Sequence, residues 1–100
     1  MNRLELIAEL VERDALRYTP AGIPVVSARL THESVQVEAG VARQVQLEMA
    51  VLAAGEIAGQ LNGAELGKPY RLTGFIARKN RNSKALVFHL SEIKADTEDH

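Results

Sequence analysis

The sequence contains no cysteine and no tryptophan, and only 4% of its residues are aromatic. Without cysteine there can be no disulfide framework, thiolate nucleophile or cysteine-ligated zinc, and this absence is typical of a reducing compartment. No apolar run reaches the roughly 18 residues that a membrane span needs, and the N-terminus lacks the pattern of a signal peptide. We therefore expect a cytoplasmic protein that is neither inserted into a membrane nor exported.

The remaining composition is that of one small folded domain. Apolar residues make up 46% of the 100 residues and charged residues 25%, which is ordinary for a globular protein and too apolar for a disordered one. This length has room for one core. We expect a domain over residues 1–94, followed by an acidic, mobile tail over residues 95–100 that shows no periodicity.

The net charge of −1 favours no class of partner, but the charges are unevenly distributed. Residues 61–94 hold seven basic and two acidic side chains, whereas residues 1–60 hold five basic and eight acidic ones. A nearly neutral protein can therefore present one cationic face.

Alternation of apolar and polar residues predicts four β-strands. The clearest alternation follows Val41, and a polar hairpin loop over residues 79–83 separates the last two strands. The predicted strands are residues 23–31, which follow a Pro-Ala-Gly turn signal, and residues 41–52, 70–76 and 86–90.

Two further segments complete the predicted order of elements. Residues 4–11 fit both the two-residue period of a strand and the i, i+3, i+4, i+7 spacing of a helix, so periodicity leaves this segment open. One helix is predicted over residues 53–61, where Asn62-Gly63 supplies a stop signal. If the first segment is a strand, this is the element order of an OB-fold, which often binds oligonucleotides. We therefore predict an all-β, five-stranded OB-fold barrel with one short helix between strands three and four.

The residues that could carry chemistry give little support for an enzyme. His32 and His89 are the internal candidates for a general base, and no serine lies in a nucleophile motif. His32 has no second histidine four residues on, as a zinc-binding helix would need. For both histidines we expect a surface or hydrogen-bonded position on a strand. We predict no catalysis, no metal and no cofactor.

The most informative cluster is the stretch Arg78-Lys79-Asn80-Arg81-Asn82-Ser83-Lys84. Four cations on a hairpin loop can follow a phosphate backbone without reading its bases, although a solvated charged loop is the alternative. In an OB-fold this loop is one of two that flank the ligand face. The other loop follows strand one and holds Arg13, Arg17 and Tyr18, together with two carboxylates that weaken its field.

Aromatic side chains on which bases could stack are scarce. We expect Phe75 and Phe88 to be claimed by core packing, which leaves Tyr18 and Tyr70. If the protein binds single strands, most of its affinity should be electrostatic. Four loop cations would then give a salt slope of up to about −3.

Several segments, taken together, form a distinctive set. They are Asn2-Arg3-Leu4, residues 18–24 (Tyr-Thr-Pro-Ala-Gly-Ile-Pro), residues 32–36 and 38–40, Arg43-Gln44, and Gly74-Phe75-Ile76. This set resembles the family of primosomal replication protein N, or PriB, over nearly the whole chain. The resemblance implies a strand at the first segment and a non-catalytic OB-fold homodimer. Such proteins bind single-stranded DNA and help the primosomal helicase to reload the replication machinery.

The resemblance also implies where DNA would be bound. In the family, contacts come from the loop after strand one, from the loop between strands four and five, and from residues along strands two and three. On this chain the resemblance carries over to five basic residues, Arg17, Arg78, Lys79, Arg81 and Lys84. The full set of candidate DNA-binding residues adds Tyr18, Arg43 and Gln46.

Three positions depart from the family's pattern. Gln46 stands where well-known members have a tryptophan, Glu33 where they have a basic residue, and Val41 where they have an aromatic one. The lost aromatic removes about 1 to 3 kcal/mol of stacking, and the carboxylate repels a phosphate backbone. We therefore expect weak DNA binding, with more of the protein's work done through the helicase.

The expected partners are single-stranded DNA, the primosomal helicase, other primosome proteins and a second copy of the chain, but no membrane. The alternative function is that of a protein-interaction adaptor with weak or negligible DNA binding. In that case the charged loop docks on an acidic partner protein.

Overall fold

The N-terminal segment that periodicity left open is a strand, β1 (Leu4–Arg13), in the computed structural model, which describes residues 1–96. Its even-numbered side chains point toward the core, and Ala8 and Leu10 are buried. A β-bulge between Leu10 and Glu12 bends the strand, so that its first half pairs with β5 and its second half with β3. β1 thereby closes the sheet into a barrel.

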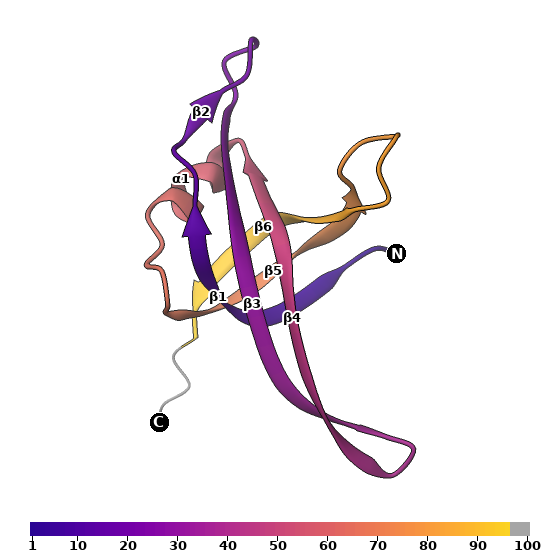
Figure 1. Cartoon of the computed structure of the whole chain (residues 1–100). Coiled ribbons are helices and arrows are strands. Elements are labelled where there is room, and N and C mark those ends of the chain that lie inside the picture. The colour runs from indigo at the N-terminus through magenta and orange to yellow at the C-terminus, as the bar shows by residue number, and fades with distance from the viewer. Residues whose placement is uncertain (97–100) are drawn as a thin grey trace.

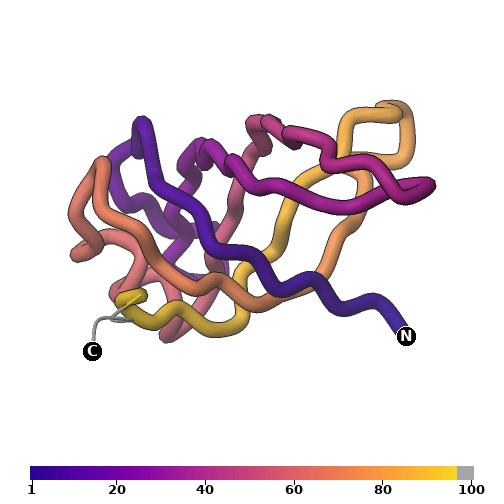
Figure 2. Tube along the Cα trace, turned by 90° about the horizontal axis from the view of Figure 1, so that it is seen from below, coloured from indigo at the N-terminus to yellow at the C-terminus, as the bar shows by residue number. Residues whose placement is uncertain are grey.

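The barrel consists of five strands in the order β1-β5-β6-β4-β3 (Figures 1 and 2). Neighbouring strands are antiparallel except for β4 and β6, which run parallel. A two-residue strand, β2, pairs with the start of β3. The predicted OB-fold barrel with one helix between its third and fourth strands is confirmed. The remaining elements are β2 (Arg17–Tyr18), β3 (Pro24–Glu38), β4 (Val41–Ala54), α1 (Glu56–Asn62), β5 (Pro69–Arg78) and β6 (Leu86–Ala95).

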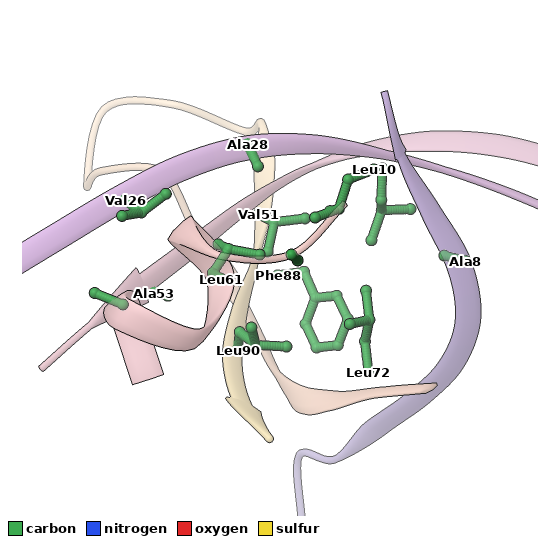
Figure 3. Close-up of a cluster of buried hydrophobic side chains, with 13 residues drawn as sticks. Ala8, Leu10, Val26, Ala28, Val51, Ala53, Leu61, Leu72, Phe88 and Leu90 are labelled. Carbon is green, nitrogen blue, oxygen red and sulfur yellow. The ribbon is translucent and has the colours of Figure 1, made fainter. Parts of the chain in front are cut away.

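The core fills the barrel between its strands and α1 (Figure 3). Phe88 is fully buried, as expected, and α1 contributes Ala58 and Leu61 to the same cluster. The Arg13 guanidinium donates hydrogen bonds to the carbonyl oxygens of Leu61 and Ala64. Because α1 has no basic residue in its last turn, this side chain from β1 supplies the positive charge that the C-terminal end of a helix favours. The largest fully buried side chains are Phe88, Leu10, Leu30, Leu61, Leu72, Val26 and Val51.

The strands are longer than predicted, and several predicted boundaries differ from those of the structure. The helix begins at Glu56 rather than at residue 53, because Ala53 still belongs to β4, opposite Val26, and Gly55 turns the chain with φ 87°. β3 continues seven residues beyond Thr31. β6 includes Ala95, one residue past the expected end of the domain. Asp96 follows β6, and its N–H donates to the Pro69 carbonyl oxygen. Residues 97–100 of the expected tail lie outside the described residues.

β3 and β4 form a long hairpin that projects beyond the barrel (Figure 1). Their register is continuous from Val25 opposite Ala54 to Glu38 opposite Val41. The two residues between the strands, Ala39 and Gly40, both have positive φ, which suits the two-residue turn of a hairpin. The described part of the chain contains no helix long and apolar enough to cross a membrane.

Candidate nucleic-acid interface

A groove with a volume of about 860 Å³ crosses the outer face of β3, β4 and β6. Side chains on this face alternate with those of the core: Ser27 and Arg29 on β3 point outward, while Val26 and Ala28 point inward. The segment after β1 and the loop between β5 and β6 border the groove. The charged residues that line it are Glu12, Arg13, Asp14, Arg17, Arg29, Glu48 and Lys79, and His89 also lines it.

The structure brings Arg17 and Lys79 to the same groove from segments far apart in the sequence. The Arg17 guanidinium donates a hydrogen bond to the Ser27 hydroxyl oxygen over 3.2 Å, which ties it to the outer face of β3. Lys79 begins the loop between β5 and β6, and its backbone N–H donates to the Ala85 carbonyl oxygen over 2.9 Å. Each of the two loops predicted to flank the ligand face thus contributes one cation to the lining of this groove.

The loop over residues 79–85 is folded by its uncharged polar side chains. The Asn80 side-chain oxygen accepts a hydrogen bond from the Asn82 N–H over 2.9 Å, and the Ser83 hydroxyl accepts one from the Ala85 N–H over 3.0 Å. Such local bonds stabilise tight turns. The asparagines and the serine thus shape the loop, which leaves the cations between them free to face solvent.

The four cations of this segment, Arg78, Lys79, Arg81 and Lys84, are all exposed. None of them forms an ion pair within residues 1–96, where the ion pairs are Arg3–Glu5, Arg29–Glu48, Arg43–Glu38 and Lys94–Glu92. Like charges held close together without acidic partners create a positive potential that attracts polyanions. The loop is a cationic rim of the groove.

Of the eight predicted contact residues, Arg17 and Lys79 line the groove. Arg78, Arg81 and Lys84 belong to the same segment as Lys79 but do not line the groove themselves, and neither do Tyr18, Arg43 and Gln46. Arg43 lies near the end of the β3–β4 hairpin, where its guanidinium pairs with Glu38 over 2.5 Å. Gln46 is exposed on the outer face of β4, directly opposite Glu33. Tyr18 is 68% exposed on β2, next to Arg17. Because successive side chains of a strand alternate in direction, Arg43 and Gln46 point to opposite faces of the hairpin.

Two residues outside the predicted set lie in or beside the groove, Arg29 and Phe75. Arg29 lines the groove, but its guanidinium is paired with Glu48 over 3.5 Å. The expectation that Phe75 belongs to the core is wrong, because its side chain is 44% exposed and stacks on His89. The alternation of side chains along each strand could have predicted both positions. Arg29 lies between buried residues of β3, and Phe75 falls on the same side of β5 as the exposed Arg71.

His32 has the hydrogen-bonded strand position that was expected for it. Its Nδ1 lies 2.7 Å from the Ile7 carbonyl oxygen and its Nε2 lies 2.8 Å from the Ser34 hydroxyl. Since a carbonyl oxygen can only accept, the proton of the neutral ring is on Nδ1. His32 therefore links β3 to β1 through its ring.

Comparisons with known proteins identify the family. Residues 2–92 match a family described as "Another single-strand binding protein family". Replication restart protein PriB of Bordetella pertussis is 39% identical to the chain, over 94% of this chain and 88% of that protein. The chain belongs to the PriB family. The solved PriB structure from Ralstonia solanacearum is 44% identical, covers 96% of this chain and 98% of its own, and superposes with a TM-score of 0.88.

The fold of this PriB family member also occurs in more distant proteins. The single-stranded DNA-binding protein of Thermus aquaticus superposes with a TM-score of 0.74 at 24% identity, over 95% of this chain and 50% of that one. At that identity the likeness concerns the barrel alone. The resemblance noted in the sequence is thus confirmed at the level of family and fold.

Proposed function

We propose that the chain is a non-catalytic accessory protein of replication restart that binds single-stranded DNA along the groove. The cationic rim at residues 78–84 holds the phosphate backbone, with Arg17 on the opposite side of the groove. Membership of the PriB family and the position of this rim support the proposal. The observation that carries it is that all four rim cations are exposed and free of ion pairs within residues 1–96.

The decisive experiment replaces all four rim cations with alanine and measures binding of a labelled oligodeoxythymidine by anisotropy at two salt concentrations. Each phosphate contact on a single strand contributes about 0.7 to the slope of log K against log salt. The wild type should show a slope of about −3, and the variant should lose most of it. An unchanged slope would show that the rim does not contact the backbone.

A matched control keeps the change in net charge but alters a different surface. The replaced cations are Arg3, Lys68, Arg71 and Lys94, which lie outside both the groove lining and the segment 78–84. This variant loses the same four positive charges, and its salt slope should stay close to that of the wild type. Equal losses in both variants would indicate attraction by overall charge rather than by the rim.

A second candidate function, a protein-interaction adaptor, is favoured by the acidic residues near the groove. Glu33 lies opposite Gln46, and Glu48 pairs with Arg29, on the same outer face of β3 and β4. Carboxylates at these positions repel a phosphate backbone. In the adaptor mode the rim contacts an acidic surface of a protein such as the primosomal helicase. Calorimetry of helicase binding separates the two functions, because the rim variant then loses helicase affinity rather than DNA affinity.

We also propose that the protein acts as a homodimer, and an open strand edge supports this. Within residues 1–96, β1 has β5 on one side from Leu4 to Glu9, but it meets β3 on its other side only from Glu9 onward. Between Leu4 and Glu9, the edge of β1 that faces away from β5 has no strand partner within residues 1–96. This edge offers backbone groups to another strand. A second copy of β1 has the complementary edge.

A further inference from the structure

The outer face of β5 and β6 carries an aromatic pair to which the cationic rim gives no function. Phe75 and His89 lie directly opposite each other in the β5–β6 register. Their rings are stacked, with centroids 4.8 Å apart and planes 1° apart. Phe75 is 44% exposed, although burial of a large apolar ring favours folding. The exposure of the pair therefore calls for a role outside the core.

The aromatic pair continues the floor of the groove. His89 lies opposite Leu52 of β4, and both residues line the groove. Phe75 stacks on the other side of His89, so that Leu52, His89 and Phe75 form one row across three neighbouring strands. The row forms a strip of aliphatic and ring surface that begins inside the groove at Leu52 and His89 and ends beside it at Phe75.

The cationic rim starts close to this pair along the same strand. Phe75 lies on β5, three residues before Arg78, where the rim begins, and the loop leads from β5 into β6 (Figure 1). Three residues of a strand span on the order of 10 Å. A single strand whose backbone follows the rim thus carries its bases past the pair. Sites for single strands combine these two features, a cationic track for the backbone and aromatic faces for the bases.

We propose that a nucleobase of single-stranded DNA stacks against the Phe75–His89 pair. This inference rests on the proposed function, and it adds a base-binding subsite on β5 and β6 to the backbone contacts. The subsite supplies an aromatic face that β4 lacks, since Gln46 has no ring to offer. Its contribution depends on bases and not on phosphate charge, because every nucleobase presents a π-face.

The test compares two labelled oligonucleotides with the same backbone, an oligodeoxythymidine and a strand of abasic sites. Phe75→Leu keeps an apolar side chain at the position but removes the ring. It should weaken binding of the oligodeoxythymidine about five-fold or more and leave both the salt slope and the affinity for the abasic strand unchanged. The rim variant is the matched comparison, because it should weaken binding of both strands and flatten the salt slope.

Phe75→Trp provides a second readout, which does not depend on whether the folded protein tolerates a leucine at position 75. The chain has no tryptophan, so the fluorescence of this variant reports one site. The oligodeoxythymidine should quench it, and the abasic strand should not. Leu66→Trp is the control, because Leu66 is 50% exposed but does not line the groove, and its fluorescence should change little.

The outcomes separate this inference from the proposed function. If Phe75→Leu binds both strands as the wild type does while the rim variant loses affinity, the subsite is wrong and the proposed function stands. An unquenched Phe75→Trp that still binds the oligodeoxythymidine leads to the same conclusion. If the wild type binds neither strand, the proposed function fails and the subsite fails with it.

Discussion

Gly74 on β5 is a position where the addition of a single methyl group should strongly destabilise the barrel. It lies at a bulge in the β5–β6 pairing, and a Cβ there would overlap with the His89 carbonyl oxygen and lie 2.6 Å from Cε1 of Phe88. Gly74→Ala should therefore lower the free energy of unfolding by about 3 kcal/mol. Urea unfolding measures this change.

Gly59→Ala is the control for that substitution, and the expected sign is opposite. Gly59 lies inside α1, and a methyl group at this position would meet no atom of another element within 4 Å. Replacing a glycine in a helix by alanine should raise the free energy of unfolding by about 1 kcal/mol. Equal stability of the two variants would contradict the close approach of β6 at Gly74.

At the same scale, Phe75 shows how the size of a side chain can mislead an interpretation. A large aromatic ring predicts a place in the core, yet the odd-numbered position of Phe75 on β5 points away from Leu72 and Ile76 and toward the outer face. The alternation of the strand therefore outweighed hydrophobicity. Phe88 has the reverse arrangement, because its position alternates with outward His89 and places the ring in the core.

At the scale of the elements, Arg13 and Arg17 should separate support of the helix from binding of DNA. Arg13 donates to carbonyl oxygens at the end of α1, whereas Arg17 donates to the Ser27 hydroxyl oxygen. Arg13→Gln should lower the free energy of unfolding by about 2 kcal/mol and leave the salt slope unchanged. Arg17→Gln should flatten the slope by about 0.7 and keep the stability.

The measurements for this pair are urea unfolding and anisotropy at several salt concentrations, made on both variants. Loss of slope in Arg13→Gln without loss of stability would show that Arg13 contacts the backbone instead of supporting α1. Both arginines lie in the same short stretch of sequence, so only the three-dimensional contacts distinguish their roles.

The elements also show which parts of the fold follow from the sequence. β4 could be predicted because one of its faces lies against the core, which imposes the alternation that identifies a strand. The second half of β3 could not, because beyond Thr31 the hairpin leaves the barrel and both of its faces lose that constraint; Val35 and Val37 are 69% and 76% exposed. Pairing with β4 rather than burial holds this half in place.

At the scale of the whole molecule, the candidate site exists because closure of the barrel brings distant parts of the chain together. The sequence predicts the cationic loop by its composition, but the groove joins residues from β1, β3, β4 and β6 that are up to 77 positions apart, from Glu12 to His89. Such a set depends on strand order and register. Local sequence patterns reveal neither strand order nor register. The rim could therefore be predicted, whereas the row formed by Leu52, His89 and Phe75 could not.

The proposed homodimer gives the last expectation at this scale. If two copies pair along the open edge of β1, a charge on that edge should prevent association, because two symmetry-related cations repel each other and the added lysines require water. Ile7 is 38% exposed beside this edge, and Ile7→Lys should sediment with the 10.9 kDa mass of one chain, whereas the wild type should sediment at twice that mass. Val11→Lys is the matched control, because Val11 is 47% exposed at the bulge, between two residues of β1 that pair with β3, and this variant should remain dimeric. Dissociation of both variants, or of neither, would place the dimer contact elsewhere on the molecule.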